Sequence, residues 1–117
     1  MLVADMDMLE LQEQFIGALL DAVPEPWERI EVQYENFAWS DDRSEIYVAN
    51  RFLAGEKADV DLSLEAIEAL AALQAHPPEG QGEPWTWLTF TINATGEYHF
   101  DYRYGVPPLI AREMAAQ

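Results

Sequence analysis

Glu97, His99 and Asp101 follow one another at two-residue spacing, and side chains of these types act as acids and bases or bind metal ions. In an extended strand the three side chains would share one face. The polar face of any amphipathic strand shows the same alternation, however. No second histidine stands at a spacing that suits a metal ion, and the chain has no cysteine. We therefore expect no catalytic residue, metal ion or cofactor, and we keep a small hydrolase that uses these three residues as an alternative.

These residues belong to the clearest structural pattern of the sequence, a β-hairpin between Trp85 and Tyr104. Apolar and polar residues alternate on both sides of the tetrapeptide 93–96. A type I turn with Gly96 in the left-handed region would place Asn93 opposite Glu97. The register that follows pairs Ile92 with Tyr98, Phe90 with Phe100 and Leu88 with Tyr102. From Leu88 to Tyr102, every large apolar side chain would then lie on one face.

Two upstream segments show helical periodicity. Met6–Val23 and Leu62–His76 place apolar residues on one helical face, and aspartate or serine residues that can cap a helix stand at the start of each. Prolines follow both segments and end them. A further proline pair precedes a possible short C-terminal helix from Leu109 to Ala116.

Between the two helices, residues 29–52 have strand periodicity on either side of a turn at Ser40–Arg43. This pattern predicts another hairpin. The apolar phase slips after Tyr34, so we expect a β-bulge near Glu35-Asn36 that restores one apolar face. In the returning strand, we expect Ile46, Val48 and the residues in phase with them on the core face.

The predicted elements indicate an α+β fold of two layers. We expect a four-stranded antiparallel sheet of two hairpins with helices packed on one face, in the order α-β-β-α-β-β plus the possible C-terminal helix. The 117 residues, half of them hydrophobic, suit a single domain over 1–117. The other sheet face would be open and is expected to display Glu31, Gln33, Glu35, Glu45, Tyr47, Arg51, Trp87, Thr89, Thr91, Glu97, His99, Asp101 and Arg103.

The formal charge is −16, from 22 acidic and 6 basic side chains. Such a charge repels nucleic acids and membrane surfaces and attracts basic partners, although it also serves solubility alone. No apolar run reaches the ~18 residues of a membrane span, and the N-terminus lacks the basic and apolar segments of a secretory signal. We expect a cytoplasmic protein without direct contact to nucleic acid or membrane.

Short motifs along both hairpins occur in a recognisable order. They are Pro26-Trp27 at the first strand, Ser44-Glu45 leading into Tyr47, Trp85 with Leu88-Thr89, and Gly96 followed by Asp101-Tyr102 and Tyr104. In order and spacing, over most of residues 24–104, they resemble the YezG-like antitoxin family, whose best-known members are immunity proteins against secreted nuclease toxins. The chain departs from that pattern in its short connections, its proline-rich loop before Trp85 and its C-terminal tail.

The resemblance implies an immunity protein, or antitoxin, that binds a cognate nuclease toxin and inhibits it. The charge agrees with this, because a nuclease cleft that holds phosphates is basic and attracts an acidic partner. An acidic adaptor domain with a non-toxin partner is the alternative. Because an unpaired sheet edge can join two copies, we expect a monomer or a weak homodimer.

The acidic and aromatic residues of the expected open face and of its turn are the candidates for partner binding. A solvated hairpin tip also explains the acids of the turn, and a cross-strand cation–π contact with Arg103 also explains Trp87. The candidates are Glu31, Glu35, Asp41, Asp42, Glu45, Tyr47, Trp87, Glu97 and Asp101.

Overall fold

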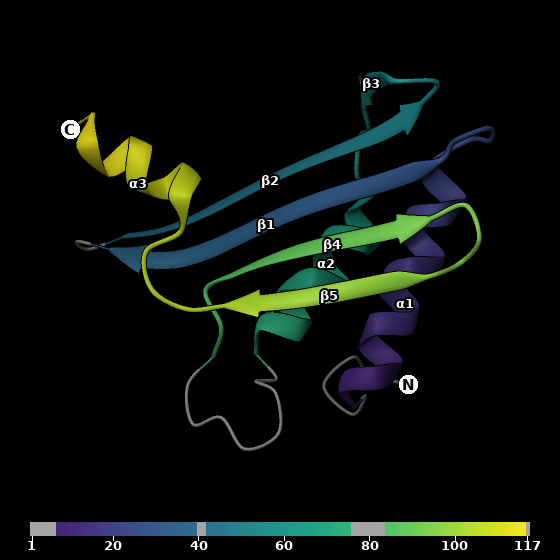
Figure 1. The fold of residues 1–117 in the computed structure, drawn as a ribbon. Coiled ribbons are helices and arrows are strands. Elements are labelled where there is room, and N and C mark those ends of the chain that lie inside the picture. Colours follow the sequence, from purple (N-terminus) through teal and green to yellow (C-terminus); the bar gives the residue numbers. More distant parts are fainter. Residues whose placement is uncertain (1–6, 40–41, 76–83, 117) are drawn as a thin grey trace.

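In the computed structural model, which describes residues 7–39, 42–75 and 84–116, five antiparallel strands form one sheet in the order β3-β2-β1-β4-β5. Two helices, α1 and α2, lie on one face of this sheet, as Figure 1 shows. The elements are α1 (Met8–Ala22), β1 (Arg29–Trp39), β2 (Asp42–Leu53), β3 (Glu56–Asp59), α2 (Leu64–Gln74), β4 (Trp87–Asn93), β5 (Tyr98–Arg103) and α3 (Pro108–Ala115). The predicted α+β fold is therefore confirmed.

Both long helices begin at the kind of cap that the sequence offered. The side chain of Asp7 accepts a hydrogen bond from the amide of Glu10, and the side chain of Glu10 accepts one from the amide of Asp7, which makes a capping box. The hydroxyl of Ser63 accepts from the amide of Ala66 at the start of α2. These bonds satisfy amides that have no partner inside the helix.

The second hairpin has the predicted register. Gly96 has a φ of 94°, its amide donates to the carbonyl of Asn93 (2.9 Å), and the amide of Asn93 donates to the carbonyl of Glu97 (2.8 Å). Ile92 pairs with Tyr98, Phe90 with Phe100 and Leu88 with Tyr102. The turn and the alternation fix this register together, because a slip by one residue would move every apolar side chain to the other face.

The large apolar side chains of this hairpin meet the helices. Phe15 of α1 contacts Phe90 edge to face, with ring centroids 5.1 Å apart. Trp85, just before β4, is buried and donates its indole N–H to the carbonyl of Leu73 in α2 (3.1 Å). The core therefore lies between the sheet and the α1–α2 layer.

The first hairpin differs from its prediction in two ways. β1 and β2 pair without interruption from Arg29 opposite Phe52 to Trp39 opposite Asp42, so the bulge expected near Glu35-Asn36 is wrong. This register also sets Ala49 opposite the buried Val32, on the helix-covered face. In β2 the two faces are therefore the reverse of our expectation: Ala49 and the residues in phase with it face the helices, and Ile46 and Val48 face the other way.

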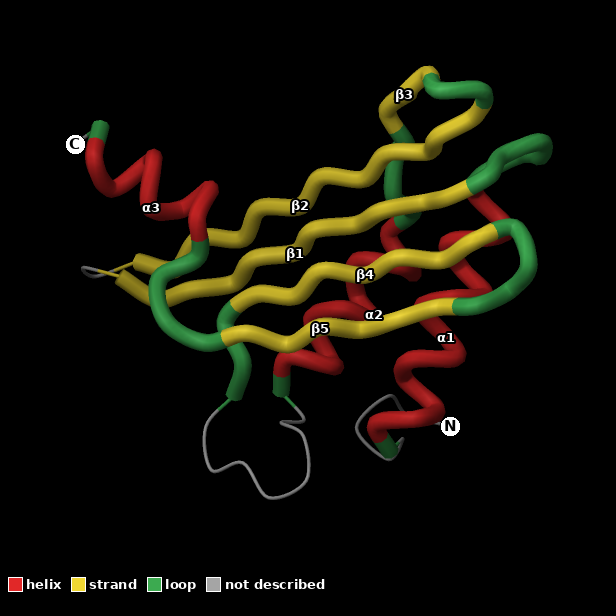
Figure 2. The backbone as a smooth tube through the Cα atoms, viewed as in Figure 1, coloured by secondary structure: helices red, strands yellow, loops and turns green. Residues whose placement is uncertain are grey.

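The reversed faces of β2 have a physical cause in α3. In Figures 1 and 2 the chain after β5 crosses in front of the ends of β1 and β2, and α3 begins there, on the sheet face opposite α1 and α2. Its Ile110 is fully buried. Because α3 supplies an apolar neighbour there, part of the face that we expected to be open is covered, and apolar residues of β2 can point toward it.

β3 was not predicted. Ala54 and Gly55 have φ angles of 53° and 80° and form a two-residue turn between Leu53 and Glu56. The strand that follows is short, polar and exposed, so it has no apolar alternation. No helix within residues 7–39, 42–75 and 84–116 is long and apolar enough to cross a membrane.

Candidate partner-binding surface

The face of the sheet opposite α1 and α2 is less acidic than expected. Glu31 of β1 forms an ion pair with Arg29, with 3.0 Å between Oε2 and Nε. Asp101 of β5 forms another with Arg103, at 2.7 Å. Both carboxylates are thus compensated by an arginine on the same strand.

Two predicted residues of β2 lie on the other face. Tyr47 pairs with Tyr34 and Glu45 with Asn36, and the hydroxyl of Tyr34 donates a hydrogen bond to the carboxylate of Glu45. Because Tyr34 points to the helix layer, Glu45 and Tyr47 do too. The expected placement of Glu45, Tyr47 and Arg51 on the open face is therefore wrong. Although Tyr47 lies on the helix-covered face, 42% of its surface is still exposed to solvent.

Glu35 is fully buried and not displayed to solvent. One of its carboxylate oxygens accepts the amide of Ile110 (2.9 Å), and the other accepts the amide of Leu109 (3.0 Å) and the side-chain amide of Gln33 (2.7 Å). Pro107, the N-cap of α3, offers no side-chain cap, so Glu35 supplies the missing acceptor. Its sequence-based assignment to a partner surface is wrong, because this carboxylate anchors α3.

Trp87 lies where the register predicted it, opposite Arg103. The guanidinium carbon of Arg103 stands 5.4 Å from the centre of the Trp87 ring, and the same guanidinium pairs with Asp101. The three side chains form one cluster at the end of the β4–β5 pair. Trp87 and Asp101 are therefore already engaged within the protein.

The three residues considered for acid–base chemistry are not gathered into a site. Glu97 lies in the turn and is exposed, His99 is an exposed residue of β5 opposite Thr91, and Asp101 is paired with Arg103. Among the described residues, no group of three or more histidines, aspartates and glutamates is placed to hold a metal ion.

The turn between β1 and β2 carries two further candidates. Asp41 lies outside the described residues, and Asp42 begins β2 opposite Trp39. Both remain predictions. The indole N–H of Trp39 donates to the hydroxyl of Ser44 (3.0 Å), which ties the two strands together near their tip.

The helix layer carries part of the negative charge without any compensating base of its own. α1 and α2 contain acidic residues and no basic one. The six basic residues of the chain all lie on the sheet or on α3: they are Arg29, Arg43, Arg51, Lys57, Arg103 and Arg112. The two helices of this layer are therefore uniformly acidic, whereas the sheet carries charges of both signs.

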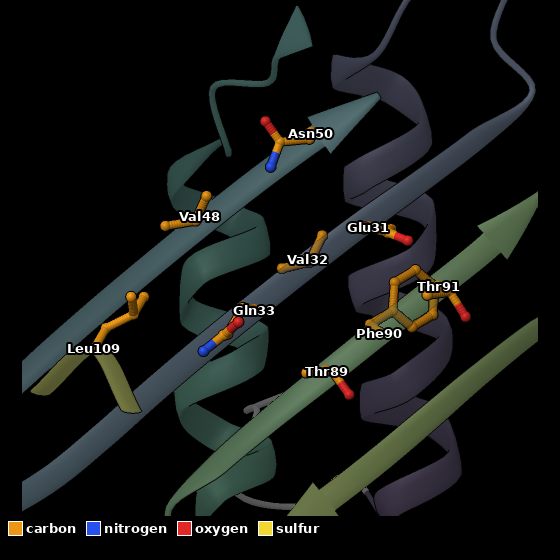
Figure 3. Close-up of a pocket in the computed structure, with 9 residues that line it drawn as sticks. All are labelled: Glu31, Val32, Gln33, Val48, Asn50, Thr89, Phe90, Thr91 and Leu109. Atoms are coloured by element: carbon orange, nitrogen blue, oxygen red, sulfur yellow. The ribbon is translucent and has the colours of Figure 1, made fainter. Parts of the chain in front are cut away.

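A hollow of about 350 Å³ lies on the face that α3 shares (Figure 3). Leu109 of α3 and Val48 of β2 are apolar parts of its lining, and Gln33, Thr89 and Thr91 supply amide and hydroxyl groups. Among the described residues that line it, Glu31 alone is ionisable, and it is already paired with Arg29. The sequence interpretation missed this hollow because it placed Val48 in the core.

A second hollow, of about 440 Å³, opens at the edge of β2 that faces away from β1. Tyr47 lines it together with Asp59, Asp61 and Leu62 from the chain that follows β3. Asp59 and Asp61 were also missed by the sequence interpretation. The Ala54-Gly55 turn was the signal that could have found them, because a tight turn there folds this segment back against β2.

With this geometry in place, comparison with known proteins adds one finding. The chain is 25% identical over 113 residues to the protein named immunity protein YezG of Bacillus spizizenii, and the match covers 83% of this chain and 68% of that protein. No family model matches the chain. The match supports the resemblance seen in the motifs as far as a relationship to immunity proteins.

Proposed function

We propose that this protein is an immunity protein that binds a cognate nuclease toxin and inhibits it without chemistry of its own. The similarity to immunity protein YezG carries this proposal. That similarity covers 83% of this chain, so it extends well beyond any single motif.

The charge of the protein supports a nuclease as the target. A nuclease must hold phosphates with lysine and arginine, so its cleft is basic. A partner with a charge of −16 is drawn to such a cleft and competes with the polyanionic substrate. Inhibition by exclusion of substrate requires only binding, with no chemistry by the inhibitor.

The predicted contact residues do not all support this function equally. Glu35 is used to hold α3, and Glu31 and Asp101 are paired with arginines. Asp42, Glu45 and Tyr47 all belong to β2, and Asp41 precedes it. The proposed contact surface is therefore β2 with its turn, rather than the whole open face.

The function is tested with the toxin encoded beside the gene. Purified protein added in stoichiometric amount is expected to abolish DNA cleavage by that toxin. Continued cleavage at an excess of this protein would contradict the proposal and would favour the adaptor alternative.

Charge reversal at Asp41 and Asp42 is expected to slow association most at low salt, because screening is then weakest. An unchanged association rate would remove the turn from the contact surface.

A further inference from the structure

β2 has a sheet edge that β3 covers only in part. β3 pairs with β2 only from Asn50 to Leu53. Val60 then donates its amide to the carbonyl of Ala49 (2.9 Å), and the chain turns away toward α2. From Ser44 to Val48, within the described part of the chain, β2 pairs with β1 alone.

The backbone groups at this edge can be assigned to a side. In an antiparallel strand the N–H and C=O of one residue point to the same side, and neighbouring residues alternate. The carbonyl of Ala49 points away from β1, because it binds Val60. The N–H and C=O groups of Tyr47 and Glu45 therefore also point outward, in the plane of the sheet.

The second hollow lies directly beside these groups. Tyr47 forms its aromatic wall and is 42% exposed. Asp59 and Asp61 are exposed, and neither forms an ion pair with any described residue. Two carboxylates next to an aromatic ring are complementary to a lysine or arginine side chain.

The charge of the chain decides between the possible occupants of the edge. Arg51 lines a neighbouring hollow together with both aspartates but forms no ion pair with either. A second copy would bring another −16 and two more such aspartates to the same place. A strand from a basic protein would instead bring cations to the hollow. Strand addition to an exposed edge draws its affinity from backbone hydrogen bonds and its specificity from pockets for alternate side chains.

We propose that an extended segment of the toxin adds as a further strand along β2 at Glu45 and Tyr47, with a lysine or arginine side chain in the hollow between Tyr47, Asp59 and Asp61. This inference rests on the proposed function and names its contact. The added strand would continue the line of β3 beyond the point where the chain leaves the sheet.

The test uses the full chain and a catalytically inactive form of the toxin encoded beside the gene. Tyr47→Pro removes an outward N–H and the aromatic wall, and an edge strand tolerates proline where the N–H faces away from its neighbour. Tyr98→Pro is the matched control: Tyr98 is 47% exposed, and its backbone points away from β4 because the adjacent Glu97 faces Asn93. Circular dichroism confirms that each variant is folded.

We expect Tyr47→Pro to weaken toxin binding at least about tenfold and Tyr98→Pro to change it by less than about threefold.

The hollow is tested separately. Asp59→Lys is expected to weaken binding at least about tenfold, whereas Asp21→Lys, the same charge change on the exposed face of α1, has a small effect. In the wild-type complex, the amides of Glu45 and Tyr47 are expected to exchange hydrogen more slowly, and that of Tyr98 at its former rate.

The outcomes separate this inference from the proposed function. If the wild type binds the toxin while Tyr47→Pro and Asp59→Lys behave like their controls, the edge is the wrong site and the function stands. If the wild type does not bind, both fail. A wild-type dimer in sedimentation that protects the Glu45 and Tyr47 amides without toxin would assign the edge to a second copy and overturn the inference.

Discussion

Glu31 and Glu35 stand four residues apart on one face of β1, and the structure gives them different roles. Glu35 is fully buried and binds two amides of α3, whereas Glu31 is half-exposed and paired with Arg29. We predict that Glu35→Ala lowers the free energy of unfolding by about 1–3 kcal/mol or more, because it leaves buried amides without a partner.

The matched change Glu31→Ala is expected to cost about 0–1 kcal/mol, as exposed ion pairs do. Urea unfolding measures both variants. Hydrogen exchange at Leu109 and Ile110 shows whether α3 is the element that loosens. Equal destabilisation by the two variants, or unchanged exchange in α3, would contradict the anchoring role of Glu35.

Tyr34 is a second residue whose environment sets a measurable property. Its burial and its hydrogen bond to Glu45 raise the pKa of its hydroxyl well above the usual value. An unfolded chain ionises this group at about pH 10, while the folded chain keeps the proton. The resulting stability is fully present below about pH 10 and is lost as the pH rises above it.

We therefore predict that the free energy of unfolding falls between about pH 10 and about pH 12, with up to about 1.36 kcal/mol per pH unit due to Tyr34. Tyr34→Phe is expected to flatten this slope. Burial also raises the pKa of Tyr102, so part of the slope remains in the variant. Identical slopes for wild type and Tyr34→Phe would show that Tyr34 ionises alike in both states.

At the scale of the elements, two glycines give a matched test of local conformation. Gly96 ends the β4–β5 turn with a φ of 94°, whereas Gly17 lies inside α1, and a Cβ atom would meet nothing within 4 Å at either position. Gly96→Ala is expected to destabilise by about 1–2 kcal/mol through backbone strain. Gly17→Ala is expected to stabilise by about 0.5–1 kcal/mol, because alanine favours the helix. Thermal unfolding gives both signs, and two shifts in the same direction would contradict the assigned conformations.

The elements also show what the sequence could predict. The β4–β5 register followed residue by residue from the turn, because the turn sets the pairing and a slip by one residue would move apolar side chains of one strand to the other face. The faces of β2 could not be predicted in this way. Both of its sides carry apolar residues, since α3 covers one of them, and α3 is placed there by a carboxylate 74 residues earlier in the chain.

The candidate site was predictable to a similar extent. Local patterns flagged Glu45 and Tyr47 as partner residues, but they placed them on the wrong face and missed Asp59. Whether the N–H groups of Glu45 and Tyr47 are free to bind another strand is a property of the assembled sheet, because it depends on how far β3 pairs with β2. The sequence of β3 is too short and too polar to reveal where that pairing stops.

At the scale of the whole molecule, the acidic residues of α1 and α2 predict how toxin binding would depend on salt. Exposed acids such as Glu13 and Glu68 lie on the helix layer, without a basic residue in α1 or α2, while the proposed contact is at the edge of the sheet. The helical acids would then act at long range. Their field speeds the encounter with a basic toxin without touching it.

We predict that replacing Glu13 and Glu68 by glutamine lowers the association rate at low salt by about twofold and leaves the dissociation rate unchanged. At about 1 M salt, where the screening length is only about 3 Å, the difference should vanish. Gln14→Ala, a neutral change on the same helix, serves as control.

Tyr47→Pro should instead act mainly on dissociation, because it removes direct contacts. Stopped-flow measurements separate the two rates. A faster dissociation in the glutamine variant would place the helix layer inside the interface, and the sheet edge would then not be the sole contact.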